Sequence, residues 1–329
     1  MMHSTTFLPM AAGFPDLAGH HRHLLDDRVR TEAFLRALRR AVRPGMVVAD
    51  VGTGTGILAI AARRAGAARV YGIETRPIVH VARQLAAANG VDGIEWVEGD
   101  ATRVLLPEKI DLVVSECFGP MAIGGSMIEA VASLAARHLR PSGSVVPGRV
   151  SLWLAPVEAP RDFAQLIAPS RRRYGLSWAA LRALMTHNLY NTEIARAALL
   201  AAPACVAELD ARSGVEATLS STVEFACRRA GRVHGFAGWF EAQLSDGVRL
   251  STAPGRPKTI WRQVFFPLGE ARRVQRGTPI EVCWTATRAA DARQVRHFDW
   301  SGSIGGWAFR QSTRYSVPDG WGAPASRSS

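Results

Sequence analysis

The segment VVADVGTGTGIL, residues 47–58, constrains the fold of this 329-residue chain more than any other feature. An apolar run ends at Asp50 and Val51, and three glycines follow at Gly52, Gly54 and Gly56. Apolar residues then recur at helical spacing as far as residue 65. Glycine lets the backbone turn sharply and approach a ligand closely. We therefore expect a strand, a tight loop and a helix, with the loop forming a nucleotide-type binding site.

Strand-like and helix-like segments alternate on both sides of this loop. We expect strands at 46–51, 69–73, 94–97 and 110–115, a helix at 80–89, and one amphipathic helix before the first strand. Alternation of this kind is typical of a doubly wound parallel sheet. The first half of the chain is therefore predicted to be a Rossmann-like α/β domain.

The pattern changes after Pro147. Residues 148–160 resemble a strand and 161–200 are helical or irregular, whereas short β-like runs separated by turn residues continue from Cys205. This pattern predicts an antiparallel sheet or β-barrel. The predicted domains are a lid helix region at 1–45, a Rossmann-like domain at 46–147, a barrel domain at 148–320 and a disordered tail at 321–329.

Composition excludes several classes of protein. No apolar stretch approaches the roughly 18 residues of a membrane span, no secretory signal is readable, and the expected location is the cytoplasm. The four cysteines form no C-x-x-C pair, which argues against a zinc site or a disulfide framework. The formal charge of +12 comes from arginines dispersed along the chain. We therefore do not expect nucleic acid as a partner.

Acidic residues beside the strand ends indicate which nucleotide binds. Glu74, after the second strand, can accept both ribose hydroxyls of an adenosine, although it could also be a charge at a helix N-terminus. An NAD site would share this geometry. Asp50 and the segment EGDAT, residues 98–102, favour S-adenosylmethionine instead. Asp50 could order the loop and meet the methionine part, while Asp100 or Thr102 could meet the adenine amine or be plain turn residues.

Several segments in order along the chain resemble the protein arginine methyltransferases. They are DDRVRTEAF (26–34), VADVGTGTGIL (48–58), GIE (72–74), SECFG (115–119), SM (126–127), VVPGR (145–149), GFAGWFEAQL (235–244) and TIWRQVFF (259–266). The resemblance implies a Rossmann-like domain, a β-barrel domain, a helical dimerisation arm within about 160–195, and a homodimer. It also implies that Pro147 follows a cis peptide bond and that Arg30 pairs with the cofactor carboxylate.

The motifs and the resemblance together imply a set of cofactor-binding residues, which lie before, within and after the glycine loop in the sequence. Its members are Arg30, Asp50, Gly52, Thr53, Gly54, Gly56, Glu74, Asp100, Ala101, Thr102, Glu116 and Met127.

The acceptor motifs depart from the family pattern. The family holds the acceptor guanidinium with two glutamates on one loop; Glu116 matches the first, whereas Gly125 occupies the position of the second. The Thr-His-Trp triplet of the family reads Thr259-Ile260-Trp261, and its N-terminal aromatic motif reads Ala11-Ala12 through Pro15. Binding a buried guanidinium with Glu116 alone would leave part of the cation unpaired, at a cost of about 3 kcal/mol or more.

We therefore expect a methyltransferase that acts on a nitrogen or oxygen of a non-arginine small molecule or peptide. Glu116 would be its general base or orienting acceptor. The expected acceptor pocket is lined by Cys117, Met121, Gly125, Ile260 and Trp261.

Three alternatives stay open: an arginine methyltransferase with a substitute carboxylate such as Glu129, a cofactor-binding protein without turnover, and a nucleic-acid methyltransferase. No metal is expected at His20, His21 and His23, because methyl displacement needs none.

Overall fold

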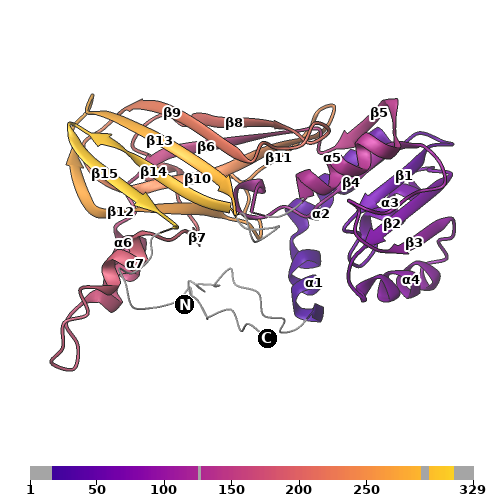
Figure 1. Ribbon diagram of the computed structural model, residues 1–329, viewed down its shortest axis with the longest axis horizontal. Coiled ribbons are helices and arrows are strands. Elements are labelled where there is room, and N and C mark those ends of the chain that lie inside the picture. Colours follow the sequence, from indigo (N-terminus) through magenta and orange to yellow (C-terminus); the bar gives the residue numbers. More distant parts are fainter. Residues whose placement is uncertain (1–16, 125–126, 290–295, 315–329) are drawn as a thin grey trace, which may run out of the picture.

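The computed structural model describes residues 17–124, 127–289 and 296–314. It contains a parallel-sheet domain and an antiparallel domain side by side (Figure 1). Three features of the sequence lie outside the described residues: Ala11 to Pro15, Gly125 and the predicted tail at 321–329.

Within the described residues, two helices precede the first strand, where the sequence predicted one. Helix α1 spans Leu17–Asp26 and α2 spans Arg28–Ala41. The break falls at Asp27, whose carboxylate accepts a hydrogen bond from the Arg30 backbone N–H at 2.9 Å and so caps α2. Apolar periodicity continues through the break, which is why spacing alone did not reveal it.

The first domain is a five-stranded parallel sheet in the order β3-β2-β1-β4-β5. Its strands are β1 (Val47–Val51), β2 (Arg69–Glu74), β3 (Ile94–Glu98), β4 (Ile110–Ser115) and β5 (Leu139–Val146). The connecting helices are α3 (Ile57–Arg64), α4 (Ile78–Ala88) and α5 (Met127–His138), with the short helix η1 (Pro120–Ala122) before α5. Strand β1 is buried along its whole length, as expected of a central parallel strand. The Rossmann-like prediction is confirmed.

The second domain consists of two antiparallel sheets. One has the order β7-β12-β10-β6-β8, with β11 beside β10; the other has the order β15-β14-β13-β9. The strands of the first sheet are β6 (Arg149–Val157), β7 (Tyr190–Thr192), β8 (Ala204–Asp210), β10 (Gly231–Ser245), β11 (Val248–Ser251) and β12 (Gln263–Val274). Those of the second are β9 (Thr218–Ala226), β13 (Pro279–Arg288), β14 (Arg296–Ile304) and β15 (Trp307–Ser312). The predicted antiparallel architecture is confirmed.

A mainly helical segment leaves the antiparallel domain between β6 and β8. It contains α6 (Pro160–Ile167), η2 (Ala168–Ser170), α7 (Leu181–Thr186) and η3 (Arg196–Ala198). The part between η2 and α7 projects away from both domains (Figure 1). Tyr174 is 92% exposed and Leu176 59% exposed on this projection. Large apolar side chains of this kind, held in solvent, are typical of a surface that contacts another protein.

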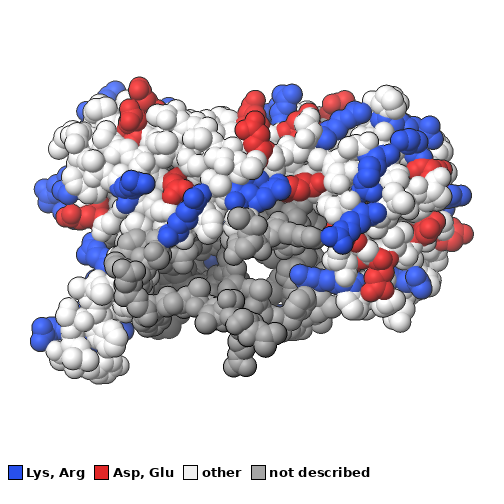
Figure 2. All heavy atoms as spheres, in the orientation of Figure 1, with Lys and Arg blue, Asp and Glu red and all other residues white. Residues whose placement is uncertain are grey.

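The two domains share one apolar core. Phe118, in the loop after β4, packs between Phe34 of α2 and Phe240 of β10, with ring centroids 6.5 Å and 4.9 Å away. The Val146–Pro147 peptide bond at the junction is cis, as the resemblance implied. Side chains of both charges alternate over the surface in view (Figure 2). Across the described ranges, no helix combines the length and apolar character needed to cross a membrane.

Candidate cofactor and acceptor site

The glycine loop after β1 requires glycine at three positions. Gly52, Gly54 and Gly56 have φ angles of 70°, 54° and 80°, a region that side chains rarely adopt. A Cβ atom at Gly52 would overlap the Cys117 sulfur, and one at Gly56 would lie 2.6 Å from the Trp96 ring. The loop is therefore both conformationally restricted and closely packed from below.

Asp50 orders this loop from beneath. One of its oxygens accepts hydrogen bonds from the Thr53 hydroxyl at 2.6 Å and from the Ala59 backbone N–H at 3.0 Å. The side chain is buried, and this burial raises the pKa of Asp50 to about 7. Asp50 thus connects the end of β1 to the loop and to the first turn of α3.

Glu74 lies at the end of β2 beside the glycine loop. One oxygen accepts a hydrogen bond from the Gly54 backbone N–H at 3.0 Å, and the other accepts from the backbone N–H groups of Thr75 at 2.9 Å and Arg76 at 3.1 Å. The residue is 9% exposed. Loop and carboxylate are therefore held together, as a nucleoside site at this edge of a parallel sheet requires.

Asp100, Ala101 and Thr102 form a turn after β3. The Asp100 carboxylate accepts hydrogen bonds from the backbone N–H and the hydroxyl of Thr102, at 2.9 Å and 2.7 Å. Ala101 is buried, and its carbonyl accepts a hydrogen bond from Arg137 of α5 at 2.5 Å. This geometry agrees with the plain-turn interpretation, and a role in binding the adenine amine stays a prediction.

Arg30 and Glu116 form a buried ion pair that connects α2 to the loop after β4. Arg30 also donates to the Leu24 carbonyl at 2.7 Å, and burial lowers its pKa to about 10. Its Nε atom is buried without a hydrogen-bond partner among the described residues. A buried guanidinium with an unused donor beside the glycine loop suits the carboxylate of S-adenosylmethionine. The residues present therefore fit the cofactor.

His21 was not included in the predicted cofactor set, although it faces the glycine loop. A Cβ atom at Gly54 would lie 3.0 Å from the His21 ring. Burial lowers the pKa of His21, so the ring is neutral near pH 7. The spacing of histidines along α1 did not predict this contact, because the contact arises from the position of α1 over the glycine loop. No group of three His, Cys, Asp or Glu side chains in the described ranges could hold a metal ion.

The structure places the residues predicted to line the acceptor pocket in different environments. The Cys117 thiol contacts the Val51 and Gly52 carbonyls at 3.7 Å, and desolvation raises its pKa to about 12. Met121 of the predicted acceptor pocket and Met127 of the predicted cofactor set are 2% and 1% exposed and belong to the shared core. In this structure Cys117 therefore supports the cofactor loop, and neither methionine is open to solvent.

Ile260 and Trp261 contact the cofactor domain from the antiparallel side. The Trp261 indole N–H donates to the Phe118 carbonyl at 3.1 Å, and the Ile260 backbone N–H donates to Asp27 at 2.7 Å. Ile260 is 37% exposed, whereas Trp261 is buried. The loop after β11 therefore adjoins both the start of α2 and the residues that follow Glu116.

Glu129, the candidate substitute carboxylate, contacts other charges. It forms ion pairs with Arg288 at 2.6 Å and with Arg296 at 3.1 Å. Arg296 is buried and also donates to the backbone carbonyls of Glu216 and Ala217, at 3.2 Å and 3.3 Å. Glu129 therefore joins α5 to β13 and β14.

Comparison with known proteins identifies the chain. Residues 148–302 match the arginine methyltransferase oligomerization subdomain, and residues 27–147 match the ribosomal protein L11 methyltransferase model. Protein arginine N-methyltransferase PRMT10 of Oryza sativa subsp. japonica is 30% identical over 322 residues, covering 86% of this chain and 84% of that protein. Protein arginine N-methyltransferase 6 of Xenopus laevis is 30% identical over 278 residues, covering 79% of this chain and 81% of that protein.

Solved structures share the fold. A chain of the Trypanosoma brucei PRMT1 enzyme–prozyme complex with AdoHcy aligns with a TM-score of 0.85 at 22% identity, covering 91% of this chain and 99% of that one. Arabidopsis thaliana protein arginine methyltransferase 10 aligns with a TM-score of 0.80 at 25% identity, covering 90% and 97%.

Fold, site and comparisons together define an S-adenosylmethionine-dependent methyltransferase, with S-adenosylmethionine as its cofactor. The chain belongs to the protein arginine methyltransferase family.

Proposed function

We propose that this protein methylates a guanidinium nitrogen of arginine in a protein or peptide. The observation that supports the proposal is the Arg30–Glu116 pair, in which the Glu116 carboxylate already binds a guanidinium in a buried setting. The relatives that align with this chain over most of their own length are named protein arginine N-methyltransferases. The comparisons give no support to the non-arginine acceptor that Gly125 and Ile260 led us to expect.

The proposed chemistry assigns one task to Glu116. S-adenosylmethionine supplies a methyl group from its sulfonium in an in-line displacement. An arginine acceptor enters protonated, because its pKa exceeds about 12, and must release one proton for each methyl group gained. Glu116 accepts hydrogen bonds from the guanidinium and orients one nitrogen toward the methyl group. Because position 125 is glycine, the N–H groups on the other side of the guanidinium must be bound by residues outside this loop.

A non-arginine acceptor is the second candidate, and the environment of Glu129 favours it. The Glu129 carboxylate is directed toward β13 and β14, where it pairs with Arg288 and Arg296, and so it does not stand in for the missing glutamate of the loop after β4. A neutral amine or hydroxyl needs only one hydrogen-bond acceptor, which Glu116 alone supplies.

Labelled S-adenosylmethionine distinguishes the two candidates. The purified protein is incubated with an arginine-containing peptide, the same peptide with lysine in place of arginine, and a pool of small amines and alcohols. We expect label on the arginine peptide only, located on the guanidinium by mass spectrometry. Glu116→Gln should reduce the transfer about 100-fold, and Glu95→Gln, a change at an exposed position of β3, should leave it unaltered. Label confined to the small molecules, or cofactor binding with no transfer, would overturn the proposal.

We further propose that the chain forms a homodimer through the segment between η2 and α7. Its exposed apolar side chains are Tyr174, Leu176 and Trp178, and Leu184 of the adjoining α7 is also exposed. Exposed Val81 and Leu85, one turn apart on α4, offer an apolar surface on the cofactor domain of a second copy. The match of this region to an oligomerization subdomain supports the assignment.

Light scattering after size-exclusion chromatography tests the dimer. We expect the mass of two chains for the unaltered protein and of one chain for the Tyr174→Glu/Leu176→Glu double variant. Ser177→Glu places charge in the same exposed segment without removing apolar surface, and should remain dimeric. A single-chain mass for the unaltered protein would contradict the proposal.

A further inference from the structure

Two strands of the antiparallel domain have unpaired edges that face each other. Among the described strands, β8 is the last of its sheet and pairs only with β6, and β9 is the last of the other sheet and pairs only with β13. The two strands lie close together, and no ladder joins them within the described residues. Alternate backbone N–H and C=O groups along each edge therefore point away from the pairing partner.

A groove opens where the beginning of β8 meets the end of β9. It has a volume of about 690 Å³, and its walls include Pro203, Phe225 and Cys227. The opposite end of β8 contacts the cofactor domain, because the Arg212 guanidinium donates to the Gly143 and Pro141 carbonyls at 3.1 Å. The groove thus lies at the end of the strand pair that is remote from the cofactor site.

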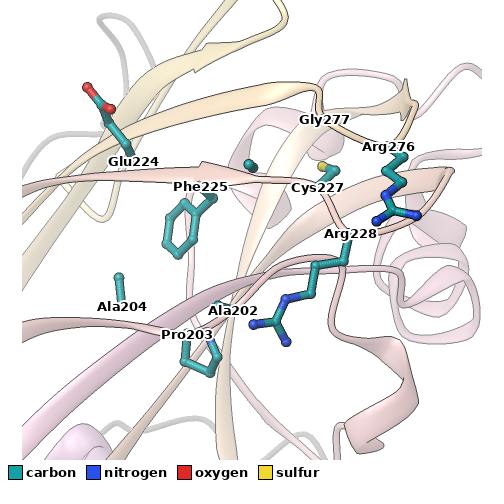
Figure 3. Close-up of a pocket in the computed structure, with 10 residues that line it drawn as sticks. Ala202, Pro203, Ala204, Glu224, Phe225, Cys227, Arg228, Arg276 and Gly277 are labelled. Atoms are coloured by element: carbon teal, nitrogen blue, oxygen red, sulfur yellow. The ribbon is translucent and has the colours of Figure 1, made fainter.

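Two arginines line one end of this groove. Figure 3 shows Arg228 and Arg276 on the same side, with Glu224 at the far end. Both arginines are exposed, and within the described ranges neither guanidinium forms an ion pair or hydrogen bond. Arg229 differs, since Glu158 binds it at 2.5 Å. Hydrogen bonds hold the backbone at Arg228, whose N–H donates to the Leu200 carbonyl at 2.7 Å.

We propose that this groove binds an acidic peptide segment of another protein as an added β-strand. The strand pairs with the free edge of β8 or β9, and its carboxylates bind Arg228 and Arg276. Side chains of a strand alternate between two faces, so a segment with acidic and β-branched residues in alternation directs carboxylates to the arginines and apolar groups to Phe225. The proposal does not depend on the methyl acceptor.

Charge and groove shape select this partner over others. A second copy of the chain would bring arginine against arginine, which disfavours pairing of the same edge with itself. A nucleic acid offers anions but has no peptide N–H and C=O groups to match a sheet edge. An acidic strand satisfies both the charge and the unpaired backbone.

Fluorescence anisotropy with a labelled Val-Glu-Val-Glu-Val-Glu peptide tests the proposal on the full chain. We expect saturable binding that weakens by about tenfold or more in Arg228→Glu/Arg276→Glu, because each reversal replaces attraction by repulsion. Arg249→Glu/Arg310→Glu, with the same change in net charge at exposed positions on β11 and β15, should bind as the unaltered protein does. Circular dichroism establishes that both variants are folded.

Backbone pairing has its own probe. Two versions of the peptide, each N-methylated at alternate residues in opposite registers, remove the N–H donors of one edge at a time. At least one version should lose binding. The proposal would be overturned if the acidic peptide did not bind, or if both double variants lost binding equally. It would also be overturned if a peptide with lysine in place of glutamate bound equally well, or if both N-methylated versions bound fully. A thymidine oligonucleotide that displaced the peptide and bound more tightly than it would likewise overturn the proposal.

Discussion

The Asp27 carboxylate accepts a hydrogen bond from the Ile260 backbone N–H at 2.7 Å, although 233 positions separate the two residues. Its other oxygen caps α2 by accepting from the Arg30 backbone N–H. A single carboxylate therefore fixes the start of the helix that carries Arg30 and holds it against the loop that contains Ile260 and Trp261. The proposed cofactor and acceptor sides of the site meet at this residue.

Removal of the Asp27 carboxylate should loosen both contacts. Asp27→Ala is expected to lower the free energy of unfolding by about 1 kcal/mol through loss of the cap, and to weaken S-adenosylmethionine binding about fivefold as Arg30 shifts. Asp27→Asn keeps one acceptor oxygen and should retain the cap while losing the contact to Ile260. Urea unfolding and calorimetric titration measure the two effects. The neighbouring Asp26→Ala is the control, and an equal loss there would contradict the assignment.

Glycine at position 52 should be required for space as well as for conformation. Gly52→Ala is expected to destabilise the protein more than Gly45→Ala, which has a φ of 87° but open space around it. Both changes incur about 1–2 kcal/mol of backbone strain, and only the first overlaps the Cys117 sulfur. Thermal unfolding of Gly52→Ala/Cys117→Ala should return to the level of Gly45→Ala. Failure of the second substitution to restore stability would contradict the steric explanation.

The buried Asp50 should make stability fall as pH rises. In the unfolded chain this carboxyl ionises near its ordinary pKa of 3.8, whereas burial raises the pKa in the folded protein to about 7. The folded state therefore retains a proton that the unfolded state has lost. The difference in free energy of unfolding between the unaltered protein and Asp50→Asn should fall by about 1.4 kcal/mol per pH unit between these two pKa values, and stay level above the higher one. Urea unfolding of both proteins through this range measures it, and parallel profiles would contradict it.

Glu129 should contribute to stability and not to methyl transfer. Glu129→Ala leaves the buried Arg296 without its ion-pair partner, and we expect a loss of about 3 kcal/mol in the free energy of unfolding. Arg288→Ala removes the more exposed partner, and should cost less than about 1 kcal/mol. Chemical denaturation gives both values. A transfer assay on the folded variant should show a rate within about threefold of the unaltered protein, whereas a loss comparable to that of Glu116→Gln would identify Glu129 as part of the acceptor site.

Much of the cofactor domain could be predicted, because its signals are local. Strand 110–115 was predicted with its observed bounds, and the glycine loop follows β1 directly. Helix α1 was merged with α2, since the apolar spacing continues through Asp27. The acceptor residues were harder to place. Cys117 follows Glu116 in sequence, yet its thiol faces the glycine loop, because the turn after β4 directs the two side chains differently.

The sequence by itself determined the order of the elements, the parallel sheet with its glycine loop, the antiparallel second half and the membership in a methyltransferase family. Periodicity, turn residues and motif spacing depend on neighbours along the chain and can be read without coordinates. Only the tertiary structure decided which distant side chains neutralise one another: Arg30 with Glu116, Glu129 with Arg296, and neither Arg228 nor Arg276 with any described carboxylate. Pairing energies depend on distance and burial in space, and these are set by how the two domains and their strand edges pack.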